Sequence, residues 1–224
     1  MLRQAGLIAA KDLRLSLRSA TGLAQTVLMG LLLVFVFSLT RHPGEAVPAL
    51  SAAAIFWLSS MFAQVLVYNG LYGLEEESGA RLGLVMAPMP PQAVWLGKAL
   101  AGFGLVLACQ AVFALAVMVF LGQNPAGSLL VGLAAVLIVD IGLASLGSLL
   151  GALASGRGAK ESLLTVVLFP LLIPVLMAGI RLLEAVIMGT EEAALDWLGL
   201  AGAYGAVFSA SALVLFPFLY TGEQ

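Results

Sequence analysis

Residues 99–155 read ALAGFGLVLACQAVFALAVMVFLGQNPAGSLLVGLAAVLIVDIGLASLGSLLGALAS, and Asp140 is their only charged residue. A helix crosses a bilayer with about 20 apolar residues, so this stretch is too long for one span. The turn-forming sequence GQNPAG at 122–127 predicts where it divides. We therefore expect two membrane-spanning helices, at about 99–121 and 128–154.

The composition of the whole chain agrees with a membrane protein. Its 224 residues are 62% hydrophobic and 10% charged, whereas soluble domains carry about 25% charged residues. The net charge of -2 leaves no basic surface for nucleic acid. Cys109 and His42 are single residues of their kinds, which excludes an internal disulfide and a His-cluster metal site.

Four other uncharged stretches predict spans at about 22–40, 49–72, 162–180 and 198–220. The first is longer than the apolar core of a signal peptide, so we expect it to be retained. The chain is thus predicted to be all-α, a polytopic membrane protein with six transmembrane helices in one domain, 1–224.

The orientation follows from the basic residues, because Lys and Arg are enriched in short cytoplasmic loops. Only Arg41 and Arg181 fall on one side of the predicted topology. Eight fall on the other side, which predicts that both termini are cytoplasmic: Arg3, Lys11, Arg14, Arg18, Arg81, Lys98, Arg157 and Lys160.

Two segments outside the spans have an amphipathic pattern. In the tail, 1–21, basic residues recur at Lys11, Arg14 and Arg18, which predicts an interfacial elbow helix. Its apolar face is predicted to be Leu2, Ala9, Leu13 and Leu17. This tail is either a simple positive-inside anchor or a contact for a partner. On the outer side, 181–197 predicts a short helix lying in the interface.

The loop at 73–98 is the longest polar segment predicted on the cytoplasmic side. It reads GLEEESGARLGLVMAPMPPQAVWLGK. Gly79 allows a sharp turn, 80–86 predicts a short helix, and the prolines from Pro88 onward terminate it. The segment is either a projecting knuckle or an ordinary solvated hairpin.

This loop resembles that of the permease subunits of type-2 ABC exporters. The shared pattern is an acidic span end, Glu-x-Gly-Ala, Ala-Pro and Leu-Gly-Lys, and here it consists of Glu75, Glu77, Gly79, Ala80, Ala87, Pro88, Leu96, Gly97 and Lys98. The resemblance implies a cytoplasmic coupling helix that docks into a separate ATPase. The ATPase-coupling residues that it implies are Glu75, Glu76, Glu77, Gly79, Ala80, Leu82, Pro88 and Lys98.

Within that superfamily the sequence is most similar to the heme exporter protein B family, CcmB. The loop, AIFWLSS at 54–60 and FPLLIPVL at 169–176 carry the likeness. Two departures are Tyr72-Gly73-Leu74, where many members have a basic residue, and Arg81 in the knuckle.

The resemblance implies a bacterial inner-membrane subunit for haem delivery in cytochrome c maturation. It also implies a homodimer with two ATPase copies, haem-handling membrane proteins and a periplasmic haem chaperone as partners. Haem would then be cargo, with ATP and Mg bound by the partner and no cofactor bound by this chain.

Three further features are candidates for function. Asp140 is an intramembrane acid, which is either functional or satisfied by Ser145, Ser148 or the backbone, or else protonated. Pro170 and Pro174 predict a helix kink that either gates an opening or only packs. His42 is either a haem ligand or a solvated loop residue.

No GxxxxGK[ST], GxSxG or HExxH motif occurs, so the sequence predicts a transporter subunit with no ATPase or hydrolase site of its own. Two other functions stay open. One is a type-2 ABC permease for a drug, lipid or glycan, and the other is a secondary transporter with an ion-coupling site at Asp140.

Overall fold

A computed structural model describes residues 1–19, 21–40, 45–154, 160–190 and 194–221, without the side chains of 154, 160–169 and 221. The described residues form helices and contain no strand. The helices are α1 (Leu2–Arg18), α2 (Thr21–Ser38), α3 (Ala49–Glu77), α4 (Ala80–Met86), α5 (Pro91–Leu121), α6 (Leu129–Ala154), α7 (Lys160–Met188) and α8 (Ala194–Thr221).

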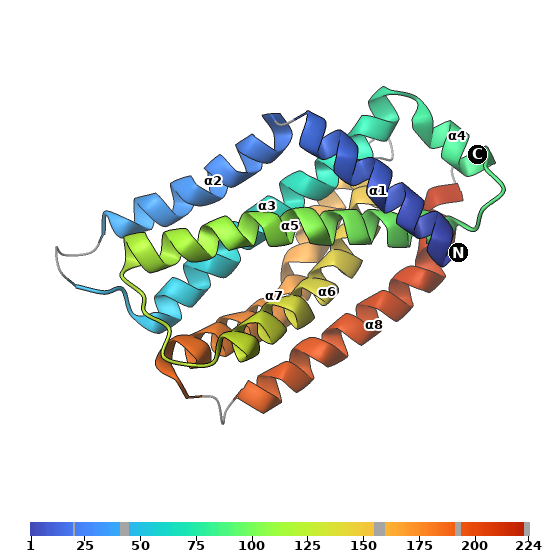
Figure 1. The fold of residues 1–224 in the computed structure, drawn as a ribbon. Coiled ribbons are helices and arrows are strands. Elements are labelled where there is room, and N and C mark those ends of the chain that lie inside the picture. Colours follow the sequence, from blue (N-terminus) through green and yellow to red (C-terminus); the bar gives the residue numbers. More distant parts are fainter. Residues whose placement is uncertain (20, 41–44, 155–159, 191–193, 222–224) are drawn as a thin grey trace.

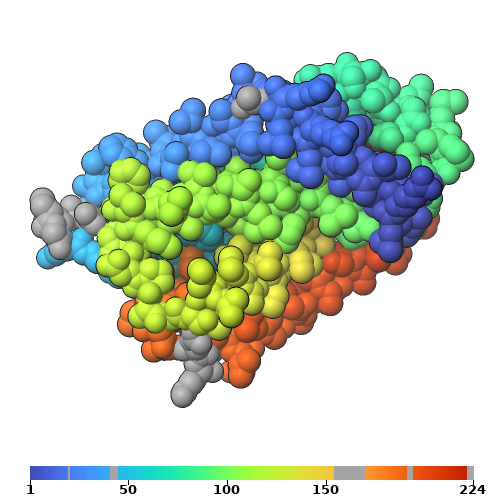
Figure 2. Space-filling model, viewed as in Figure 1, coloured from blue at the N-terminus to red at the C-terminus, as the bar shows by residue number. Residues whose placement is uncertain are grey.

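The long helices form one bundle around α3, α5 and α6, which pack on one another (Figure 1). On one side α2 packs against α3 and α5, and on the other α8 packs against α6 and α7. The amphipathic α1 lies across the surface of α5, and α4 projects beside it (Figure 2). The start of α1 and the end of α8 lie on the same side of the bundle as α4, and we call this the α4 end.

Six of the described helices are long and apolar enough to cross a membrane, namely α2, α3, α5, α6, α7 and α8. The prediction of an all-α protein with six spans is therefore confirmed. α3 and α5 are longer than predicted, since α3 continues to Glu77 and α5 begins at Pro91. These extensions carry Glu75 and Lys98, so both residues lie on helices that continue past the predicted spans.

The prediction of a separate interfacial helix within 181–197 is wrong. α7 continues through Arg181 to Met188 and ends before Gly189, which has a left-handed φ of 71°. Leu182 extends the buried stripe of α7, while Arg181 pairs with Glu184 at 2.9 Å on the exposed side. Arg181, which suggested the end of a span, therefore lies with Glu184 on the exposed face of one continuous helix.

Small residues let α6 approach α3 closely. A Cβ atom on Gly147 would lie 2.7 Å from the ring of Tyr68 and 2.7 Å from the side-chain amide of Gln64. A Cβ atom on Gly151 would collide with the ring of Tyr72. Gly199 and Gly202, in contrast, have nothing within 4 Å of such an atom. Gly147 and Gly151 of α6 thus serve packing inside the bundle, whereas Gly199 and Gly202 of α8 face outward.

At the end opposite α4, connections from different parts of the chain are tied together. The N–H of Val47 donates to the carbonyl of Leu121 at 3.1 Å, and Gln123 Nε2 donates to the carbonyl of Val47 at 2.6 Å. The N–H of Gly127 donates to Val186 at 2.9 Å. The segments around Val47, Gln123 and Val186 therefore meet at one end of the bundle.

Candidate functional site

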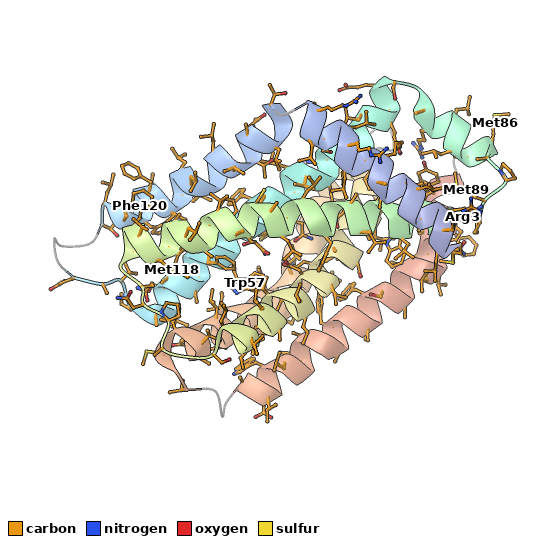
Figure 3. The ribbon with its side chains drawn as sticks, viewed as in Figure 1. Arg3, Trp57, Met86, Met89, Met118 and Phe120 are labelled. Atoms are coloured by element: carbon orange, nitrogen blue, oxygen red, sulfur yellow. The ribbon has the colours of Figure 1, made fainter. Side chains whose placement is uncertain are left out.

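The short helix α4 is the most exposed element of the α4 end. The chain leaves α3 through Ser78 and reverses at Gly79, whose φ of 69° is in the left-handed region. No residue of α4 is buried, and the apolar Leu82 and Met86 are 64% and 77% exposed. Met86 points outward from the far end of the helix (Figure 3).

Prolines fix the other flank of α4. Pro88 and Pro90 follow the helix, and Pro91 is the first residue of α5. Because proline has a fixed φ and disrupts a helix interior, these residues favour an extended backbone in the segment between α4 and α5, as seen at Ala87 and Pro90. The predicted short helix at 80–86 and its termination by prolines are both confirmed.

A cluster of four charged side chains lies at the base of α4, where α3 ends and α5 begins. Lys98 on α5 is fully buried, and its Nζ lies 2.8 Å from Glu75 Oε1 and 3.2 Å from Asp12 Oδ2. Lys11 Nζ lies 3.0 Å from Glu75 and 3.0 Å from Asp12. Each ammonium thus contacts both carboxylates, and we call this arrangement the ionic ring.

The ionic ring is balanced, since its two ammonium and two carboxylate groups leave no net formal charge. Burial lowers the pKa of Lys11, but its hydrogen bonds to Glu75 and Asp12 outweigh this, and the pKa lies above its usual value. Lys11 therefore stays charged at neutral pH. Buried ions are tolerated when they are paired and hydrogen-bonded, as they are here.

Lys98 also connects the ring to the bundle interior. Its Nζ donates to the carbonyl of Leu71 at 2.6 Å and lies 4.9 Å from the centre of the Tyr72 ring. The Tyr72 hydroxyl is 2.8 Å from that of Ser148 on α6, which donates to the carbonyl of Trp95 at 3.1 Å. The base of α4 is thereby linked by polar contacts to α3, α5 and α6.

The residues predicted for the coupling loop divide into two groups. Glu75 and Lys98 are buried in the ionic ring, and the remainder are exposed: Glu76, Glu77, Gly79, Ala80, Leu82 and Pro88. Arg81, which looked out of place in the sequence, lies 5.4 Å from the centre of the Tyr220 ring on α8. The exposed group forms a surface, and the buried group forms its support.

Asp12 was missed by the sequence reasoning, which placed α1 by its basic residues and by an apolar face of Leu2, Ala9, Leu13 and Leu17. Of these residues Ala9 is buried, whereas Leu2 and Leu17 are exposed, and the rest of the buried face is Ala5, Ile8 and Asp12. The signal was available, since Asp12 follows Ala5 and Ile8 at helical spacing. An acid on an apolar face implies a partner cation.

Asp140 lies inside the bundle and is 2% exposed. Its Oδ1 accepts a hydrogen bond of 2.9 Å from Gln110 Nε2 on α5. The side-chain partners considered from the sequence are wrong. Ser145 bonds to Ile141 and Ser209, and Ser148 bonds as described above.

Two other candidates gain little from the structure. α7 is helical through Pro170 and Pro174, both of which are exposed, and its geometry does not test a gate. His42 lies outside the described residues.

A bundle of six apolar helices, with an amphipathic helix and a projecting helix beside it, defines a polytopic helical membrane protein. A model of the family described as "CcmB protein" matches residues 3–221. The chain belongs to the CcmB family.

Its relatives include proteins named heme exporter protein B. That of Pseudomonas aeruginosa is 30% identical over 218 residues, which cover 95% of this chain and 92% of the relative. That of Rhodobacter capsulatus is 30% identical over 83% of this chain and 84% of its own length. The chain is a multi-pass protein of the bacterial inner membrane.

Proposed function

We propose that this chain is the membrane permease subunit of an ABC transporter that acts in haem delivery for cytochrome c maturation. Membership of the CcmB family and relatives named heme exporter protein B support this proposal. The partner ATPase binds ATP and Mg²⁺, and haem is cargo rather than a resident cofactor. This subunit supplies the membrane path and the moving parts.

The exposure of α4 is the observation that carries the proposal. None of the seven residues of α4 is buried, although Leu84 and Val85 pack partly against the core, and a helix this short has little stability by itself. It presents Leu82 and Met86 to solvent beside the acidic Glu76 and Glu77. A partner with an apolar groove and a basic rim fits this surface, because exposed apolar groups with a polar rim are typical of docking sites.

The orientation of the bundle follows from its charges. α4 and the start of α5, with Arg81 and Lys98, lie at the α4 end, and the basic α1 packs along α5 beside them. Arg181 instead belongs to the last turns of α7, which are tied through Val186 to the opposite end. By the positive-inside rule the α4 end faces the cytoplasm, where ATP is available. α1 then lies at the cytoplasmic surface of the membrane, against lipid headgroups.

The mechanism is mechanical. Two ATPase copies bind a homodimer of this chain, and closure of the ATPase dimer on ATP displaces α4. The displacement reaches the spans through α3 and α5, and α7 bends near Pro170 and Pro174, where backbone donors are missing. The subunit works in partnership with the haem-handling membrane proteins. Its movement either exports haem or releases a periplasmic chaperone that carries haem.

The test is affinity purification of the chain from its native membrane in mild detergent, with mass spectrometry and an ATPase assay of the eluate. We expect an ATP-hydrolysing subunit and haem-handling membrane proteins to co-purify. Leu82→Asp should reduce the recovered ATPase at least about tenfold, which is the loss of a modest interface hot spot. Leu39→Asp is the matched control, because Leu39 is also highly exposed but follows α2, away from α4 and α1.

The other outcomes separate the alternatives. An ATPase without haem proteins would favour a type-2 exporter for a drug, lipid or glycan. No ATPase at all would overturn the proposal and favour an ion-coupled transporter, for which the buried Asp140 is the candidate site. Recovery of the ATPase with Leu82→Asp at the level of the control would show that α4 is not the docking surface.

A further inference from the structure

α1 is not needed to cross the membrane, yet it is fitted closely to the bundle. Its buried face, Ala5, Ile8, Ala9 and Asp12, packs along α5. A Cβ atom on Gly97 would lie 2.7 Å from Cβ of Ile8 and 2.9 Å from the carbonyl oxygen of Ala5. Only glycine at position 97 permits this approach, so α1 and α5 touch almost at their backbones.

The ionic ring joins α1 to two helices at once. α1 contributes one ammonium and one carboxylate, Lys11 and Asp12, while α3 contributes Glu75 and α5 contributes Lys98. Going around the ring, positive and negative groups alternate, and all four contacts are between 2.8 and 3.2 Å. Removal of α1 would leave only the Lys98–Glu75 pair.

The place of the ring in the chain gives it a mechanical role. Glu75 precedes the turn at Gly79 by four residues, and Lys98 lies in the first turns of the helix that receives the chain from α4. Any displacement of α4 acts on these two attachment points. Because three of the four groups are almost closed to solvent, the ring resists separation more than a surface ion pair would.

We propose that α1 is a working part of the coupling unit, fastened through Asp12 and Lys11 to both helices that flank α4. This inference rests on the proposed function and deepens it. When the ATPase displaces α4, α1 moves with α3 and α5 along the membrane surface. Asp12 is a positioning residue, since it acts through Lys98 and Lys11 and contacts no partner.

The test is a double variant, Lys11→Gln with Asp12→Asn, which removes both ionic contacts of α1 while the ring keeps zero net charge. The Lys98–Glu75 pair remains, as does the hydrogen bond from Lys98 to the carbonyl of Leu71. The purified complex is assayed for bound ATPase and for ATP hydrolysis, and cells are assayed for mature cytochrome c. Arg14→Gln, on the exposed side of α1, is the control.

We expect the double variant to bind the ATPase and hydrolyse ATP as the wild type does, but to yield at least about fivefold less cytochrome c per ATP hydrolysed. Fivefold is the lower end of typical coupling between two sites. The control should keep the wild-type ratio. An unchanged ratio in the double variant overturns the inference and leaves the proposed function intact.

Two further outcomes are informative. If no ATPase accompanies even the wild-type chain, the proposed function fails, and the inference fails with it. If the double variant does not accumulate, Lys11→Gln alone is measured, because Lys11 is half-exposed and its loss keeps the Asp12–Lys98 pair. That single variant should also lower the ratio, and an unchanged ratio would again overturn the inference.

Discussion

The ammonium of Lys98 on α5 lies 2.8 Å from the carboxylate of Glu75 on α3, and the exposed α4 lies between these two residues in the chain. This ion pair fixes the distance between the end of α3 and the start of α5. The segment that joins these two helices, including α4, therefore projects from a rigid base. Loops usually vary in conformation, but this one has its end-to-end separation set by a buried contact.

Replacement of Lys98 by methionine should destabilise the protein strongly. The variant leaves Asp12 and Glu75 buried with only Lys11 to pair them, and breaking a buried ion pair costs about 3–5 kcal/mol. The measurement is denaturant unfolding in detergent. Arg14→Met removes an exposed charge and should stay within about 0.5 kcal/mol of wild type. Equal stability of the two variants would contradict a structural role for the ring.

Gly79→Ala should weaken the presentation of α4 without a steric clash. Nothing lies within 4 Å of an added Cβ, so the cost comes from the left-handed φ alone and is about 1–2 kcal/mol. We expect less ATPase to co-purify. Gly83→Ala, inside α4 and also with open space, should strengthen the helix by about 0.5–1 kcal/mol and serves as the control. If the two variants recover equal amounts of ATPase, the left-handed turn at Gly79 does not contribute to docking.

Gly147→Ala should destabilise the contact between α3 and α6. Its Cβ would press on Tyr68, which cannot turn away freely because its hydroxyl donates to the carbonyl of Ala99 at 3.1 Å. Overpacking of this kind costs about 1–3 kcal/mol. Thermal unfolding in detergent measures it against Gly202→Ala, which meets no atom within 4 Å. A loss of stability only in the first variant is the expected result.

Asp140→Leu should destabilise the bundle, whereas Asp140→Asn should be much milder. Leucine leaves the Gln110 amide without its acceptor, and an unsatisfied buried polar group costs about 1–3 kcal/mol. Asparagine keeps an oxygen acceptor at the same reach. Unfolding of both variants in detergent decides the matter, and equal losses would mean that the hydrogen bond with Gln110 contributes little.

Much of the fold followed from the sequence, because the bilayer sets the length of an apolar helix and charge marks its ends. The helix at 80–86 also followed, since Gly79 and the prolines after Met86 limit it on both sides. The error at 181–197 has the same origin as the successes. Arg181 was taken as a span end, although a charge on an exposed helix face does not stop a helix.

The ionic ring did not follow from the sequence, because its members are separated by up to 87 positions and each has an ordinary local explanation. Lys11 was expected on the polar face of the tail, and Glu75 and Lys98 in the loop that resembles a coupling segment. Only the packing of α1 along α5 brings Asp12 to Lys98. Such a contact depends on the tertiary arrangement of three helices, which local pattern does not encode.

Salt distinguishes the surface of this site from its base. Electrostatic contacts in water are screened over roughly 10 Å at 0.1 M salt and about 3 Å at 1 M, whereas buried pairs are screened far less. Glu76 and Glu77 are exposed, but Lys98, Glu75 and Asp12 are almost completely enclosed. A concentrated salt wash would therefore release a partner that is bound through the exposed acids. The ionic ring below α4 would stay intact, so the partner could bind again once the salt is removed.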